Sequence, residues 1–132
     1  MFQFISKRPA LCALTWASII FVLCATPGQY IPSNHWLELL SFDKLVHAGM
    51  FFVLTALLFL VAIKYNQTNK LFFIYTIVSI SYGALLELMQ AYCFNNRSAD
   101  WKDIIANSFG CLVALLFLKK MKNFYRQLKE GK

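Results

Sequence analysis

Four long apolar runs dominate the sequence and limit what the chain can fold into. They extend from about Pro9 to Ala25, Leu45 to Ile63, Leu71 to Tyr92 and Asp100 to Leu118. The hydrocarbon core of a bilayer needs roughly 20 mostly apolar residues per helix. A folded chain of 132 residues has too little interior to bury four such runs away from water. We therefore expect an all-α membrane protein with four transmembrane helices in an antiparallel bundle.

The composition supports this class and excludes others. Apolar residues make up 59% of the chain and charged residues only 14%, whereas a soluble domain has about 25% charged residues. These values exclude an ordinary soluble domain, a disordered chain and a small disulfide-stapled protein. A net charge of +7 is compatible with nucleic-acid binding in a soluble protein, but here the basic residues flank the apolar runs, and we expect no nucleic-acid partner.

The distribution of Lys and Arg predicts the orientation of the helices. If the N-terminus is cytoplasmic, three basic residues lie outside, namely Lys44, Arg97 and Lys102. The positive-inside rule then places both termini in the cytoplasm, and the basic tail over 119–132 is expected to contact anionic lipid head groups. The expected inner residues are Lys7, Arg8, Lys64, Lys70, Lys119, Lys120, Lys122, Arg126, Lys129 and Lys132.

The connection between the first two helices is the longest. Residues Ile31 to Phe42 in this connection have the pattern of a short amphipathic segment on the outer membrane surface. No repeat or linker divides the sequence, so we expect a single domain over residues 1–132.

A small group of polar residues remains at the outer ends of the second, third and fourth helices. Helical spacing places each set on one face: Asp43 and His47 are four residues apart, and Glu87 and Gln90 are three apart. In the fourth helix, Asp100, Asp103 and Asn107 share a face, which the small residues Gly110 and Ala114 continue inward. The full candidate set is Asp43, Lys44, His47, Glu87, Gln90, Arg97, Asp100, Asp103 and Asn107.

The energetic cost of placing a charged side chain in a membrane limits where these residues can lie. A charged side chain at the bilayer centre costs about 2.5–3.5 kcal/mol on insertion scales, so we expect the group to face the bundle interior and to be paired. Arg97 is the expected partner of Asp100 or Asp103 through its guanidinium fork. Capping of helix N-termini by the aspartates, and helix-to-helix hydrogen bonding by Gln90 and Asn107, are the structural alternatives.

Three sequence elements resemble those of the VanZ-like family of small bacterial membrane proteins. They are the D-K-x-x-H element from Asp43 to His47, the E-x-x-Q element from Glu87 to Gln90, and the R-x-x-D-x-x-D-x-x-x-N element from Arg97 to Asn107. The resemblance implies a multi-pass protein of the bacterial cytoplasmic membrane. It also implies a link to the cell envelope and to resistance against teicoplanin-type glycopeptide antibiotics, with which the founding member is associated.

Three functions fit this pattern. In the first, an outward-facing site binds or modifies a lipid-linked or cell-envelope molecule. His47 and Glu87 then act as acid or base, while Arg97 and Lys44, with Gln90 and Asn107, bind the ligand. The candidates that orient the acid or base are Asp43, Asp100 and Asp103.

In the second function, the polar layer is structural and the protein is a membrane scaffold that binds lipids or a partner. In the third, the protein is a small proton-coupled transporter with Glu87 as the proton-linked acid, although such a site normally lies near the bilayer midplane. Whether the chain is an enzyme stays open, and no resident cofactor or metal is expected.

Overall fold

The computed structural model describes residues 2–26, 42–93 and 100–130. Every regular element in this part is an α-helix, and the all-α class predicted from the sequence is confirmed. The segment expected over Ile31 to Phe42 lies outside the described residues, apart from Phe42 itself. The helices are α1 (Phe2–Lys7), α2 (Pro9–Ala25), α4 (Phe42–Lys64), α5 (Asn69–Tyr92) and α6 (Trp101–Glu130).

Three helices, α4, α5 and α6, are long and apolar enough to cross a membrane. The helix α2 has 17 residues, contains no charged side chain and is shorter than these three. Two boundaries differ from the sequence prediction by three residues or more. Helix α4 begins at Phe42 rather than at about Leu45, with Asp43 in its first turn, where a carboxylate offsets the helix dipole. Helix α6 continues past Leu118 to Glu130, because Lys, Arg, Gln and Leu are good helix formers.

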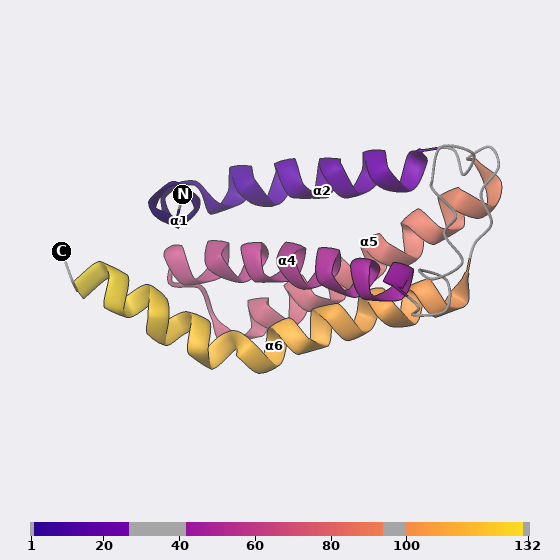
Figure 1. Ribbon diagram of the computed structural model, residues 1–132. Coiled ribbons are helices and arrows are strands. Elements are labelled where there is room, and N and C mark those ends of the chain that lie inside the picture. Colours follow the sequence, from indigo (N-terminus) through magenta and orange to yellow (C-terminus); the bar gives the residue numbers. More distant parts are fainter. Residues whose placement is uncertain (1, 27–41, 94–99, 131–132) are drawn as a thin grey trace.

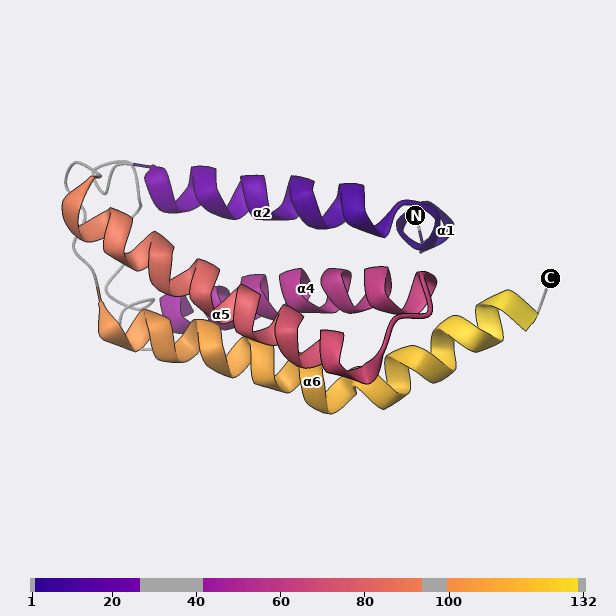
Figure 2. The same cartoon turned by 180° about the vertical axis from the view of Figure 1, so that it is seen from behind.

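The helices lie lengthwise beside one another (Figures 1 and 2). The end of α2, the start of α4, the end of α5 and the start of α6 lie at one end of the bundle, which we call the polar end. The helix α1, the turn between α4 and α5, and the end of α6 lie at the other, which we call the basic end. Helices α4 and α6 run in the same direction and make the most extensive contact in the bundle.

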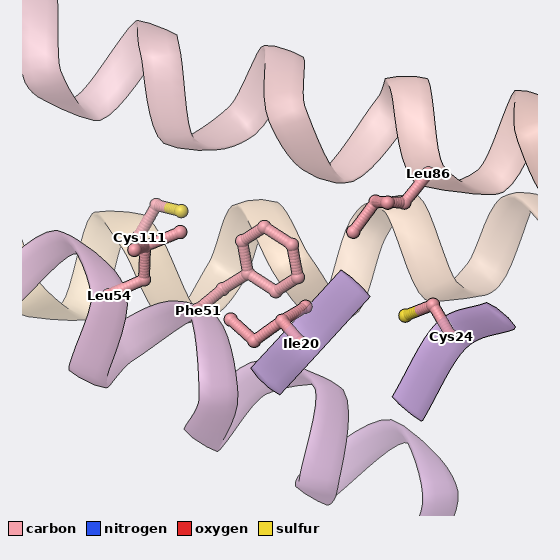
Figure 3. Packing of buried hydrophobic residues seen from close by; sticks show 6 residues of the cluster. All are labelled: Ile20, Cys24, Phe51, Leu54, Leu86 and Cys111. Atoms are coloured by element: carbon pink, nitrogen blue, oxygen red, sulfur yellow. The ribbon is translucent and has the colours of Figure 1, made fainter. Parts of the chain in front are cut away.

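The core joins all four long helices. Its largest cluster combines Ile20 and Cys24 of α2 with Phe51 and Leu54 of α4, and it also includes Leu86 of α5 and Cys111 of α6 (Figure 3). A second cluster nearer the basic end consists of Phe59, Ala62, Phe72 and Ala114. In it the Phe59 and Phe72 rings pack edge to face with centroids 5.4 Å apart.

Hydrogen bonds join the middle of α2 to its neighbours. The indole Nε1 of Trp16 donates to the Met50 carbonyl of α4 at 3.0 Å, and the Tyr82 hydroxyl of α5 donates to the Ala17 carbonyl at 2.8 Å. The outer faces of the helices are apolar, with exposed side chains such as Leu14, Ile77 and Leu116. Such a surface suits lipid, because contiguous exposed apolar patches are rare on soluble monomers.

Helices α4 and α6 approach each other closely at Gly110 of α6. A Cβ atom built on this glycine would lie 2.0 Å from the backbone carbonyl oxygen of Ala48 in α4. Small residues allow transmembrane helices to pack this closely, as the sequence pattern at Gly110 indicates. The contact fixes the position of α4 against α6 along their length.

Replacing Gly110 by Ala should therefore push α4 and α6 apart. We expect a loss of about 1–3 kcal/mol in the free energy of unfolding, the usual range for overpacking, measured by thermal unfolding in detergent. Gly49→Ala is the matched control, because a Cβ there meets nothing within 4 Å. Equal unfolding temperatures for Gly110→Ala and the native chain would show that the contact does not hold the helices together.

Candidate functional site

Eight of the nine polar residues singled out in the sequence come together at the polar end. They converge because α4 and α6 begin there and α5 ends there. The ninth, Arg97, lies outside the described residues. We call the eight residues the polar cluster: Asp43, Lys44, His47, Glu87, Gln90, Asp100, Asp103 and Asn107.

The polar cluster runs from an exposed rim to a buried floor. At the rim, the side chains of Asp43 and Asp100 are 68% and 39% exposed. Asp103 and His47 lie deeper and are buried. At the floor, Glu87 is only 1% exposed, although its side chain is ionisable.

Lys44 connects the rim to the interior. Its Nζ donates to Asp100 Oδ2 at 2.9 Å, to Asp103 Oδ1, and more weakly to Asp43 Oδ2 at 3.4 Å. These ion pairs join the first turn of α4 to the start of α6. The hydrogen bond from Lys44 lowers the pKa of the Asp100 carboxyl below its ordinary value, and the Lys102 backbone N–H acts in the same direction. Asp100 is therefore ionised at neutral pH.

His47 is oriented by Asn107 and faces two carboxylates. Its Nδ1 lies 3.2 Å from Asn107 Oδ1, and because a carbonyl oxygen only accepts, Nδ1 is the donor. Its Nε2 lies 3.7 Å from Asp43 Oδ1 and 3.8 Å from Asp103 Oδ2. The free ring nitrogen is thus held in a buried position between two acidic groups, where a proton or another cation can be shared among them.

The two residues of α5 have different surroundings. The Asp100 backbone N–H donates to Glu87 Oε2 at 3.3 Å, so this buried carboxylate contacts the start of the α6 region. Gln90 Nε2 donates to the Cys24 carbonyl at 3.2 Å and joins α5 to the end of α2. Nothing in the sequence indicates this last contact, because the Cys24 acceptor is a backbone group on another helix.

Three residues of the cluster offer ligand atoms for a metal. One atom each from Asp43, His47 and Asp103 lies within 4.8 Å of the other two, and carboxylate oxygens with imidazole nitrogen suit several divalent ions. The same two carboxylates also bind Lys44, so the ammonium and a divalent ion would share them. The sequence prediction of no resident metal stays a prediction.

Lys44 is a shared partner of the aspartates in the described part of the chain, where it binds both Asp100 and Asp103. The predicted pairing of Arg97 with one of these carboxylates lies outside the described residues and stays a prediction. A spacing signal for the Lys44 contacts was present, because Lys44 and His47 are three residues apart and so share a helix face.

A comparison of the sequence with known families gives a match over most of the chain. The family model described as VanZ/LLP1 matches residues 2–123. The chain belongs to the VanZ/LLP1 family. The match includes every residue of the polar cluster, and the family predicted from the three sequence elements is confirmed. Neither the curated proteins nor the solved structures provide a match to this VanZ/LLP1 chain.

Lys44→Met should destabilise the protein. Without the ammonium, Asp100 and Asp103 lose the cation that they share, and an unsatisfied partly buried group costs about 1–3 kcal/mol. Thermal unfolding in detergent measures the loss, with Lys102→Met as a control that removes the same charge from an exposed position. Adding Asp103→Asn to Lys44→Met should restore part of the stability. An equal loss in both single variants would contradict this role of Lys44.

Proposed function

We propose that the chain is a multi-pass protein of the bacterial cytoplasmic membrane, with one transmembrane domain over residues 1–132. Helices α2, α4, α5 and α6 span the bilayer, consecutive helices alternate in direction, and both termini lie in the cytoplasm. Helix α2 is the fourth span of this proposal. Its 17 residues are within the range for a transmembrane helix, although at the short end of it.

The basic residues support the orientation. Lys44 and Lys102 are at the polar end, and the other nine Lys and Arg residues of the described part are on the segments of the basic end. The positive-inside rule then directs the polar cluster outward. The nine residues are Lys7, Arg8, Lys64, Lys70, Lys119, Lys120, Lys122, Arg126 and Lys129.

We further propose that the polar cluster binds or modifies a lipid-linked or cell-envelope molecule at the outer surface. The observation that carries this proposal is His47, whose Nδ1 is fixed by Asn107 while Nε2 faces Asp43 and Asp103. A histidine held by a hydrogen bond at one nitrogen, with the other directed at acidic groups, has the arrangement of a proton-transfer group. A merely space-filling histidine does not need two carboxylates at its second nitrogen.

Charge indicates which part of the ligand the cluster recognises. Its described residues include four carboxylates and one ammonium, and that ammonium is already paired. A hydroxyl or amine of the ligand therefore fits better than an anionic group, since it donates to the carboxylates or passes a proton to His47 or Glu87. An anionic part of the ligand would bind Arg97, the cationic candidate that the sequence places beside the cluster.

A structural role is the second candidate, and one observation favours it. The cluster residues bind one another across helices: Lys44 joins α4 to the start of α6, and Gln90 joins α5 to α2. In this alternative the protein is a scaffold or a lipid-binding or partner-binding protein, and its polar layer holds the helices together. Hydrogen bonds between membrane helices average only about 0.6 kcal/mol, so single substitutions would lower stability slightly.

Charge-removing substitutions that nearly keep side-chain size separate the two functions. The variants His47→Gln, Glu87→Gln and Asp103→Asn should each fold and accumulate normally yet lose the envelope phenotype. The readouts are glycopeptide susceptibility, chosen from the family membership, and the composition of lipid-linked envelope precursors in a deletion strain complemented with each variant. Lys102→Gln is the control, because this exposed residue lies beside the cluster.

Two outcomes would contradict the proposed site. If all three variants complement as well as the native chain, the cluster has no role in ligand binding or chemistry. If they fail to complement only in proportion to lost abundance and a lowered unfolding temperature, the structural role is the correct one.

A further inference from the structure

The basic end of the bundle contains two adjoining cavities. The larger has a volume of ≈ 520 Å³ and lies among the end of α4, the turn after it, the start of α5 and the last part of α6. The smaller has a volume of ≈ 290 Å³ and extends toward α1. Both are lined by Lys64, Tyr125 and Lys129, so the two cavities share a wall.

One face of α6 supplies most of the basic lining. Lys122, Tyr125, Arg126 and Lys129 all line the larger cavity, and their spacing of three, four and seven residues puts them on a single helix face. This part of α6 follows the apolar span. A helix of 30 residues is about 45 Å long, whereas the hydrocarbon core is about 30 Å thick. The basic face therefore lies at head-group depth.

The described residues that line the cavities include several cations and no carboxylate. Lys64, Lys122, Arg126 and Lys129 line the larger cavity, and Lys7, Lys64 and Lys129 line the smaller one. The described acidic residues are at the polar end, apart from Glu130 after Lys129. Like charges held this close repel one another. An anion bound among them would remove that repulsion.

The contacts of these cations within the protein are with neutral groups. Lys122 Nζ donates to Asn69 Oδ1 at 2.9 Å and lies 4.4 Å from the centroid of the Phe72 ring. Lys64 Nζ donates to the Lys7 carbonyl and lies over the Tyr65 ring. These contacts hold the two side chains in place at the cavity and bring no described acidic group to either ammonium.

The rest of the lining suits a lipid. Ala62, Ile63 and Phe72 give the larger cavity an apolar part, while Asn66 and Gln67 add side-chain amides that can donate hydrogen bonds. The Arg126 guanidinium can bind two phosphate oxygens at once. Basic pockets between transmembrane helices on the cytoplasmic side are suited to the head groups of anionic lipids.

We propose that the two cavities form one binding site for the phosphate of an anionic phospholipid head group. The site is at the opposite end of the bundle from the polar cluster and uses none of its residues, so either proposal can fail without the other. Phosphate is the shared chemistry of a lipid head group and of a soluble phosphate ester, and the apolar part of the cavity favours the lipid.

Native mass spectrometry of the full chain in detergent tests this site. The protein is titrated with phosphatidylglycerol, which has a net negative charge, or with zwitterionic phosphatidylcholine, whose phosphate charge is offset by its choline group. Bound lipid is then counted. We expect phosphatidylglycerol to bind more tightly than phosphatidylcholine. The variant Lys122→Gln/Arg126→Gln should weaken phosphatidylglycerol binding about tenfold or more, since each basic residue near a membrane surface contributes measurably to anionic lipid binding.

The matched control is Lys119→Gln/Lys120→Gln, which removes the same charge from the same helix at positions that line neither cavity. Its phosphatidylglycerol binding should equal that of the native chain. Equal weakening in both variants would show that attraction is spread over the whole basic surface, and would overturn the site. Equal binding of the two lipids to the native chain would overturn it as well.

A competition experiment distinguishes a lipid phosphate from the phosphate of a soluble ester. Soluble glycerol 3-phosphate should not displace bound phosphatidylglycerol, and displacement at comparable concentrations would replace the lipid proposal with a soluble ligand. If Lys122→Gln/Arg126→Gln fails to fold, phosphatidylglycerol binding is compared between Lys129→Gln and its control Lys119→Gln. Weaker binding by Lys129→Gln alone supports the site, and equal binding by the two variants overturns it. Lys129 lines both cavities and lies near the end of α6.

Discussion

The contact between Gly110 and Ala48 determines the arrangement of the polar end. Since Gly110 has no side chain, α6 approaches the backbone of α4 so closely that a Cβ there would lie 2.0 Å from the Ala48 carbonyl oxygen. Because α4 and α6 run in the same direction, this single close approach also fixes their register. Toward the helix starts, His47 then lies opposite Asn107 and Lys44 opposite Asp103. The geometry of the acidic and basic side chains thus depends on one small residue in the apolar part of the bundle.

Most of the few charged side chains are separated by sign between the two ends of the bundle. At the polar end, Lys44 and His47 lie among the carboxylates of Asp43, Asp100 and Asp103. The fourth carboxylate, Glu87 of α5, accepts a hydrogen bond from the Asp100 backbone N–H. At the basic end, cations line the two cavities, and none of the described lining residues is acidic. Between the two ends, Phe51 and Leu86 belong to an apolar core. Partial burial makes pairing necessary at the polar end, because a desolvated charge without a partner is costly, whereas cations at head-group depth can be paired by lipid phosphates.

Much of this could be predicted from residue spacing on single helices. The intervals of Asp43 with His47 and of Asp103 with Asn107 place each pair on one face, and the structure brings these faces together. The interval between Lys44 and His47 carries the same information, whereas Arg97, the counterion predicted from the sequence, lies outside the described residues. Gln90 was recognised as polar and inward-facing, yet its acceptor, the Cys24 carbonyl, has no sequence signal. Spacing shows which residues share a face of one helix and does not show how two helices are rotated against each other.

The sequence by itself determined the class of the protein and its family, since apolar runs of bilayer length leave few alternatives and the three polar elements are specific. It also determined which residues are too costly to place in lipid. Only the tertiary structure decided that Lys44 is the common partner of the aspartates, and that the free nitrogen of His47 faces Asp43 and Asp103. The tertiary structure likewise decided that one face of the extended α6 closes a basic cavity against α4 and α5. These features depend on helix rotation, register and length, which result from packing at sites such as Gly110 rather than from the periodicity of any one helix.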